Sequence, residues 1–406
     1  METGVPHLVK TAAIQESSVQ RDNKGSPSAM MEDDFNATAT PYPGNGSLGN
    51  DTEGDYYEDY EDEFAELRRS LNVMSLVVYS LAFLLGVLGN GLVIWVTGFK
   101  MKKTVNTVWF LNLAVADFLF TAFLPLNVAY TAMGFHWPFG RFLCKANSTL
   151  AFLNMFASVY LLALISADRC LAVVWPVWAQ NHRSVRGAWA VSGAAWLLAL
   201  ALSAPYFVFR DTAPAYHDES VINCFNNFAF SDDYETPAVV QLRLFRHRAM
   251  IAARFLLGFA LPFAAIVACY AVIVCRLRRN RALAARAGRT FRIIAAVVAA
   301  FFLCWAPYHV FVLLEMCNHM AAEFSPALNH ATTIGVPIAT SLAFLNSCLN
   351  PLLYVFVGQD FQDKVRRSVL SVLESALTEE ASHSHSHSLS AFGQRSRDKS
   401  TSGAEL

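Results

Sequence analysis

An acidic and a basic residue, Asp168 and Arg169, stand side by side at the end of a long apolar stretch of this 406-residue chain. Charges at the edge of a hydrocarbon layer are costly, so a functional role is the first interpretation and a simple interfacial ion pair is the alternative. A second acid, Asp117, lies alone inside another apolar stretch and needs polar partners or a cation. We expect the partners to be Asn154, Ser158, Asn346 and Asn350.

Two further arginines, Arg210 and Arg254, end one apolar stretch and interrupt another. A buried guanidinium needs an anion, and its planar fork matches the two oxygens of a carboxylate. We therefore predict that both arginines bind a carboxylate of a ligand, in a site that also includes Tyr308 and Glu315. Pairing with a protein acid, Asp211 or Glu315, is the alternative.

The elements that must position these residues are long apolar segments. Apolar residues make up 54% of the chain and charged residues 16%, which is typical of a membrane protein. A soluble helical bundle is the alternative, but residues 76–97 and 187–209 are apolar on all sides of a helix. We predict an all-α membrane protein in which residues 71–358 form a seven-transmembrane helix bundle. Each segment reaches the roughly 20 residues that span a bilayer, and the segments are 72–98, 105–132, 141–174, 187–209, 249–276, 290–316 and 328–357.

Basic residues gather in alternate loops and give the orientation. Lysines follow the first segment, and arginines lie between the third and fourth and between the fifth and sixth segments. By the positive-inside rule these loops are cytoplasmic, so the N-terminus is extracellular and the C-terminus is inside. The first thirty residues lack the apolar core of a cleavable signal peptide, so the first segment must direct insertion. We expect a multi-pass protein of the plasma membrane.

Residues 1–70 form an acidic extracellular tail in this prediction. Residues 31–67 contain no Lys or Arg, a composition that indicates disorder and attraction of a basic partner. A tail that only aids solubility is the alternative. Three glycosylation sequons begin at Asn36, Asn45 and Asn50, and tyrosines among acids suit sulfation at Tyr56, Tyr57 and Tyr60.

Two of the eight cysteines lie on the outer side of the predicted bundle. Cys144 begins the third segment, and Cys224 lies in the loop of residues 210–248. Both face the oxidising side of the membrane, so we predict a disulfide that ties this loop to the bundle. Most of the other cysteines lie within apolar segments, where they act as packing residues.

Short motifs spread over the segments resemble the signature of rhodopsin-like G-protein-coupled receptors. They are Gly89-Asn90, Leu113-Ala-Val-Ala-Asp117, Asp168-Arg-Cys170, Trp196, Cys304-Trp-Ala-Pro307 and Asn350-Pro-Leu-Leu-Tyr354. The resemblance covers about residues 72–372, and it implies that the Asp117 cluster holds an allosteric sodium ion and that the protein needs no other cofactor. Prolines inside two segments make those helices bendable. The resemblance implies a switch that opens a cleft for a heterotrimeric G protein, made of Asp168, Arg169, Tyr270, Trp305, Pro307, Asn350, Pro351 and Tyr354.

Further motifs are similar to those of the chemoattractant branch, and within it to the chemerin receptors. These motifs lie at residues 101–118, 168–170, 176–186, 208–212, 224–228 and 358–361. Amine receptors carry an acid where this chain has Ala151, and opsins need a lysine that is missing from 328–357. The resemblance implies a peptide or small protein ligand and the inhibitory class of G protein. A formyl-peptide or complement anaphylatoxin type of receptor and a non-signalling decoy receptor are the alternatives.

Two segments follow the seventh helix. Residues 359–372 have the pattern of an amphipathic helix that contacts membrane lipid, and residues 373–406 that of a disordered tail for phosphorylation and arrestin binding. A transporter would show internal repeats, and an intramembrane enzyme would show a catalytic constellation within the segments. The sequence has neither, so we expect no enzymatic activity, and we expect no nucleic-acid partner.

Overall fold

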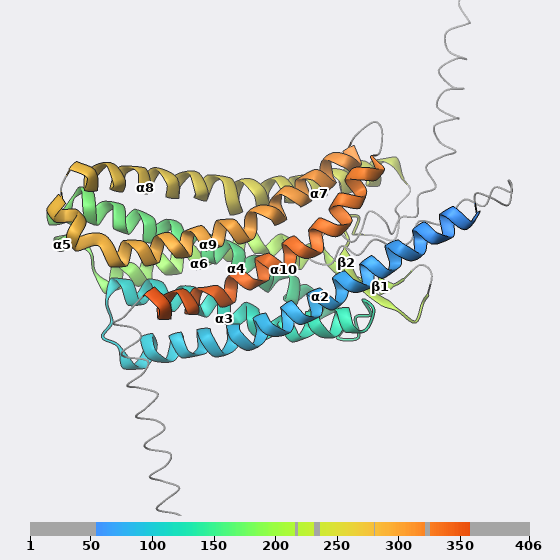
Figure 1. Ribbon diagram of the computed structural model, residues 1–406, viewed down its shortest axis with the longest axis horizontal. Helices are drawn as coiled ribbons and strands as arrows, with labels where there is room; N and C mark the ends of the chain where they lie inside the picture. Colours follow the sequence, from blue (N-terminus) through green and yellow to red (C-terminus); the bar gives the residue numbers. More distant parts are fainter. Residues whose placement is uncertain (1–53, 216–217, 231–235, 280, 321–324, 358–406) are drawn as a thin grey trace, which may run out of the picture.

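The computed structural model describes residues 54–215, 218–230, 236–279, 281–320 and 325–357, without the side chains of 54–64, 281–293, 319 and 354–357. Nearly all of this part is helical. Of two five-residue π-helical turns, η2 ends the first long helix and η3 lies between α7 and α8, and one two-stranded sheet is present (Figure 1). The elements are α2 Gly54–Trp95, η2 Val96–Lys100, α3 Val105–Ala132, α4 Gly140–Val174, α5 Pro176–His182, α6 Val185–Phe209, β1 Arg210–Pro214, β2 Ile222–Asn226, α7 Pro237–Phe255, η3 Leu256–Ala260, α8 Leu261–Arg279, α9 Arg281–Met320 and α10 Pro326–Val357.

Seven helical spans in the described part are long and apolar enough to cross a membrane, which confirms the predicted fold class. The fifth span is continuous through α7, η3 and α8. Large apolar side chains remain exposed on the outside of the bundle, with Leu88 and Leu197 each 70% exposed and Leu303 71%. A water-soluble protein would not leave such an apolar surface uncovered, whereas a bilayer covers it with hydrocarbon.

Helix α4 runs through the centre of the bundle. It contacts α3, α5, α6, α8 and α9 as well as strand β1. Its side chains Phe152, Met155 and Leu161 are fully buried in the main hydrophobic core. Because α4 touches most of the other elements, a change at one of its ends can reach several helices.

A hairpin of two antiparallel strands lies at one end of the bundle, and α5 lies at the other (Figure 1). In the hairpin, Thr212 of β1 pairs with Cys224 of β2. Cys224 is joined to Cys144 on α4 by a disulfide, so the expected bond is present. We call the end with the hairpin the hairpin end. We call the end with α5 the Asp168 end, after the charged pair Asp168 and Arg169 beside α5.

The structure differs from the sequence prediction at the start of three helices. α2 begins at Gly54, α7 at Pro237 and α9 at Arg281, rather than at 72, 249 and 290. Residues 54–70, which were assigned to a disordered tail, are therefore helical. The apolar length marks only the part of a helix that lies in hydrocarbon, whereas polar turns rich in good helix formers extend it into water. Acids in the first turns of α2 also suit the positive end of a helix dipole.

Loss of the disulfide is expected to lower the melting temperature of the detergent-solubilised protein by several degrees. The bond closes a loop across a sequence separation of 80 residues, and disulfides contribute typically about 2–4 kcal/mol of stability. The double substitution Cys144→Ser and Cys224→Ser tests this by thermal unfolding. Cys317→Ser is the control, because Cys317 is exposed and free. Equal melting temperatures of the double variant and the control would show that the disulfide does not stabilise the protein.

Candidate ligand site and switch

Arg254 is a buried cation in the hairpin-end half of the bundle. It lies at the end of α7 and is only 1% exposed. Its Nη1 donates a hydrogen bond of 2.8 Å to the hydroxyl of Tyr308 on α9. The guanidinium lies 5.2 Å from the ring centre of Phe152 and 5.4 Å from that of Tyr308. Aromatic faces stabilise a cation and hold it in place, so Arg254 is pre-oriented for an anionic ligand group.

The π-helical turn η3 begins two residues after Arg254 and brings the chain close to α4. Gly258 in η3 is buried, and a Cβ atom there would lie 2.7 Å from Cε of Met155 and 3.1 Å from Cε1 of Phe156. A side chain at this position would force Met155 and Phe156 to shift, so the glycine permits the close approach of η3 to α4. Turns of this kind occur often at functional sites, and here the turn fixes the position of the Arg254 side chain.

A chain of aromatic contacts leads from Arg254 toward the middle of α9. The Tyr308 ring packs edge-on against Trp305 with ring centres 5.8 Å apart, and Trp305 contacts Phe301 at 6.0 Å. Pro307 lies inside α9 between Trp305 and Tyr308 and removes one backbone hydrogen bond of the helix. Tyr308 is thereby in contact with the part of α9 in which Pro307 weakens the helix backbone.

Three buried polar atoms, two on α9 beside these aromatic contacts and one on the neighbouring helix α10, have no hydrogen-bond partner among the described residues. They are Trp305 Nε1, His309 Nε2 and Thr340 Oγ1 on α10. Buried polar atoms without a partner are rare in folded proteins because desolvation costs free energy. These atoms are therefore suited to hydrogen-bond a ligand or water.

Two other predicted ligand residues lie nearer the hairpin. Arg210 ends α6, begins β1 and is 4% exposed. Glu315 is half-buried on α9. Asp211, one of the alternative partners for the two arginines, is bound by the fork of Arg141, with Nε 2.7 Å from Oδ1 and Nη2 2.9 Å from Oδ2. The Asp211 carboxylate therefore already has one cationic partner, Arg141.

Asp117 lies at the centre of a polar cluster between α3, α4 and α10. It is fully buried, and its Oδ2 accepts a 2.7 Å hydrogen bond from Asn350. The Asn154 amide satisfies both of its ends when its nitrogen donates to Asp117 Oδ1 at 3.1 Å and its oxygen accepts from Ser347 at 2.8 Å. Ser158 lies 3.3 Å from the same amide. The structure thus brings Asp117, Asn154, Ser158 and Asn350 together.

The cluster fits a small monovalent cation. The side-chain oxygens of Asn346 and Asn350 are buried and have no hydrogen-bond partner among the described residues. Asn350 bonds the Asp117 carboxylate, whereas no hydrogen bond joins Asn346 to Asp117 among the described residues. A carboxylate with amide oxygens beside it is a set of hard donors of the kind that suits Na⁺.

Sequence reasoning missed two residues of this cluster. Ser347 bonds Asn154, and Asn90 on α2 donates to the backbone oxygens of Gly86 and Ser347, both at 2.9 Å. The sequence motif that contains Asn90 does not indicate its partners. The spacing of Ser347 is the sequence signal that places it in the cluster. It lies three residues before Asn350, and residues three apart lie on the same face of a helix.

Charged side chains at the Asp168 end form a second polar cluster. Arg169 donates to Asp168 at 2.6 Å and to the side-chain oxygen of Asn106 on α3. Tyr270 on α8 lies close enough to Arg169 to interact with its charge. The predicted switch residues Asp168, Arg169 and Tyr270 are therefore neighbours in this structure.

The two prolines and Tyr354 of the predicted switch lie on α9 and α10. Pro351 lies inside α10, and it packs so close to Gly89 of α2 that a Cβ atom added to this glycine would lie 3.0 Å from Cβ of Pro351. Tyr354 is in the last turns of α10, and its side chain lies outside the described residues. The same holds for the sequons at Asn36, Asn45 and Asn50 and for residues 359–406, while Tyr56, Tyr57 and Tyr60 fall in the first turns of α2 without a described side chain.

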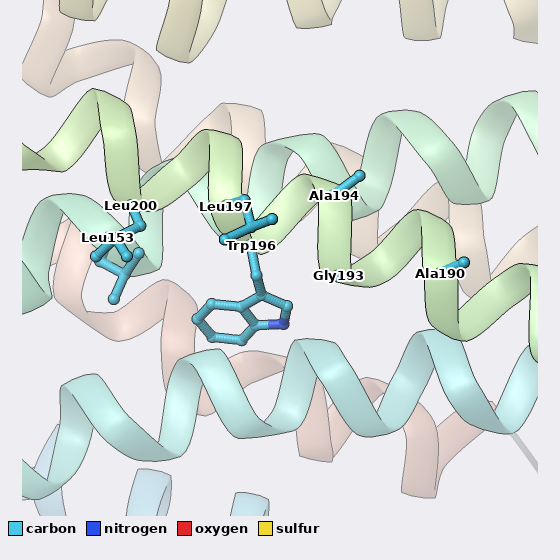
Figure 2. Close-up of a pocket in the computed structure, with 7 residues that line it drawn as sticks. All are labelled: Leu153, Ala190, Gly193, Ala194, Trp196, Leu197 and Leu200. Atoms are coloured by element: carbon cyan, nitrogen blue, oxygen red, sulfur yellow. The ribbon is translucent and has the colours of Figure 1, made fainter.

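Figure 2 shows a shallow groove on a different surface, along α6. Its volume is about 640 Å³, and it is lined by Leu153, Ala190, Gly193, Ala194, Trp196, Leu197 and Leu200. The indole nitrogen of Trp196 points away from solvent and donates to Asn112 at 3.0 Å. The groove presents apolar side chains toward the hydrocarbon, so it does not suit a ligand carboxylate.

Comparisons with known proteins agree with this geometry. The family profile described as "7 transmembrane receptor (rhodopsin family)" matches residues 89–354. Chemerin-like receptor 1 of Homo sapiens is 47% identical over 343 residues, which cover 82% of this chain and 89% of the relative. Chemerin-like receptor 2 is 44% identical in Homo sapiens, covering 75% of this chain and 82% of the relative, and 42% identical in Mus musculus, covering 80% and 87%.

The matched residues include both polar clusters and the aromatic contacts that lead from Arg254 through Tyr308 and Trp305 to Phe301. Members of this family are receptors rather than enzymes, and they connect an extracellular ligand with a G protein. With a family profile over more than half of its length and relatives above 40% identity, this multi-pass membrane protein belongs to the rhodopsin family of seven-transmembrane receptors.

Proposed function

We propose that this receptor lies in the plasma membrane with its hairpin end outside, binds chemerin or a closely similar protein, and signals through inhibitory G proteins. The observation that carries the proposal is the buried guanidinium of Arg254, hydrogen-bonded to Tyr308, which directly follows Pro307 inside α9. The identity to chemerin-like receptors supports the choice of ligand. A ligand with an anionic C-terminus complements this cation.

The geometry supports a simple sequence of events. A ligand carboxylate that binds Arg254 pulls on the Tyr308 hydroxyl, and Tyr308 moves the Trp305 ring that it contacts. The bend at Pro307 then lets the Asp168 end of α9 swing outward, and a G-protein helix enters the opened cleft. Binding energy at one end thereby favours the open arrangement at the other.

The proposal also covers the tails. The acidic N-terminal residues, with sulfate on Tyr56, Tyr57 and Tyr60 and glycans at Asn36, Asn45 and Asn50, would attract the basic body of the ligand. Residues 359–372 would lie on membrane lipid, and the phosphorylated 373–406 tail would bind arrestin.

A cyclic-AMP assay in cells expressing the receptor tests the function. Chemerin is expected to lower cyclic AMP, and pertussis toxin, which disables inhibitory G proteins, is expected to abolish the response. Formyl peptides and anaphylatoxin peptides serve as competing ligands. A response to one of these instead of chemerin would replace the ligand, and chemerin binding without nucleotide exchange would indicate a decoy receptor.

We also propose that the Asp117 cluster binds sodium, which favours the closed arrangement. Substitution of Asp117 by asparagine removes the negative charge but keeps the size of the side chain. Agonist affinity of the parent is expected to fall several-fold when sodium replaces a large organic cation at equal ionic strength, whereas the affinity of Asp117→Asn stays constant. If the variant keeps the full sodium response, the cluster has only a structural role.

A further inference from the structure

A second arginine binds the acid of the switch. Arg183 holds Asp168 with both arms of its fork, with Nε 2.7 Å from Oδ1 and Nη2 2.9 Å from Oδ2. Its Nη2 also lies 3.3 Å from the side-chain oxygen of Asn106. Arg169 uses one nitrogen for Asp168 at 2.6 Å and shares Asn106. Two cations therefore share one carboxylate and one amide oxygen.

The local sequence fixes the position of Arg183. Pro176 starts the short helix α5, and Arg183 ends it, with its backbone nitrogen donating to Ala179 at 2.9 Å. Ser184 then caps α6 by accepting a hydrogen bond from Gly187 at 3.1 Å. Because Arg183 lies between two helix ends that are both stabilised, its backbone is held opposite Asp168.

Asp168 is the only acid that pairs with Arg169 among the described residues. The segment that joins the fifth and sixth spans offers no replacement, because residues 276–292 contain seven arginines and no Asp or Glu. The side chain of Asp168 is 10% exposed and that of Arg169 is 18% exposed. Any movement of Arg169 into the cleft must therefore separate it from a carboxylate that water reaches poorly.

We propose that Arg183 is a positioning residue that makes Arg169 releasable. When Arg169 leaves, Arg183 keeps both oxygens of Asp168 bonded, so no unpaired buried charge remains. Without Arg183 the departure of Arg169 would leave a carboxylate without a cation, and such a group is strongly destabilising. Arg183 therefore favours the open arrangement.

The test is nucleotide exchange by the full-length receptor in lipid vesicles, without ligand, on purified heterotrimers of the inhibitory, stimulatory and Gq classes. The substitution Arg183→Met is expected to lower basal exchange about tenfold, the size expected for loss of a charge-assisted hydrogen bond. In the background of Asp168→Asn, which has no carboxylate to leave unpaired, Arg183→Met is expected to change exchange less than twofold. This inference rests on the switch of the proposed function but not on its ligand or G-protein class.

Arg186→Met is the matched control, because Arg186 is an exposed arginine three residues further along the chain, in the first turn of α6. It is expected to leave basal exchange unchanged. Arg183→Lys keeps the positive charge but loses the guanidinium that bonds both oxygens of Asp168. Its basal nucleotide exchange is therefore expected to lie between that of the parent and that of Arg183→Met. An equal loss from Arg183→Met in the parent and in the Asp168→Asn background would overturn the proposal, since it would indicate a direct contact with the G protein or damage to the loop. A failure of chemerin to activate the receptor would leave these results unaffected.

Discussion

The variant Arg254→Met is expected to bind the protein ligand at least about 100-fold more weakly than the parent receptor, a loss of roughly 3 kcal/mol. Arg254 is 1% exposed and is bonded to Tyr308, so a carboxylate that reaches it is shielded from water and from salt. Methionine fills a similar volume between the two rings without the charge. Equilibrium binding of labelled chemerin to membranes gives the measurement.

Amidation of the ligand C-terminus distinguishes a lost ion pair from a damaged pocket. The amidated ligand should bind the parent far more weakly than the native ligand does, whereas Arg254→Met should bind both forms equally. Arg248→Met is the matched control, since Arg248 is exposed on the same helix. If amidation weakens binding to the parent and to Arg254→Met by the same factor, the carboxylate does not bind Arg254.

The second large effect concerns signalling alone. Arg169→Met is expected to reduce agonist-driven nucleotide exchange more than about 100-fold while ligand affinity changes less than about threefold. Arg169 lies at the Asp168 end, bonded to Asp168 and Asn106, and ligand contacts lie at the hairpin end. Loss of the Arg169 cation removes the group that faces the opened cleft in the proposed switch. Truncation of a charged residue at the centre of an interface lowers the binding free energy by several kcal/mol.

Exchange and binding should be measured on the same vesicles, so that expression does not enter the ratio. Arg169→Lys keeps the charge but not the fork, and it should retain a small part of the activity. Exchange close to that of the parent in Arg169→Met would show that the charge at this position is not part of the switch.

Topology was predictable because its cause is local. The apolar length of each segment and the alternation of basic loops need no knowledge of neighbours, so all seven spans were found. Asp117 was predictable for a related reason, because an acid within hydrocarbon requires partners wherever the fold provides them. The helix starts at Gly54, Pro237 and Arg281 were missed because polar turns beyond the membrane carry no apolar signal.

The missed residues of the two polar clusters have ordinary types for their surroundings. A serine in a membrane helix, such as Ser347, usually bonds its own backbone, and only the packing of α4 against α10 gives it Asn154 as a partner. Arg183 looked like one more basic residue of a cytoplasmic loop. Its role depends on the turn between α5 and α6, which places it opposite Asp168 across a sequence separation of 15 residues.

The number of residues in the π-helical turn η3 sets the direction in which the Arg254 side chain points. A π-turn accommodates one residue more than an α-helical turn, and each residue rotates a helix by about 100°. Deletion of a single residue within Leu256–Ala260 would turn η3 into α-helix and rotate α7 about its own axis relative to α8. The guanidinium would then leave the space between Phe152 and Tyr308 with every side chain of the site still in the sequence. The number of residues in this turn is therefore part of the ligand specificity of the receptor.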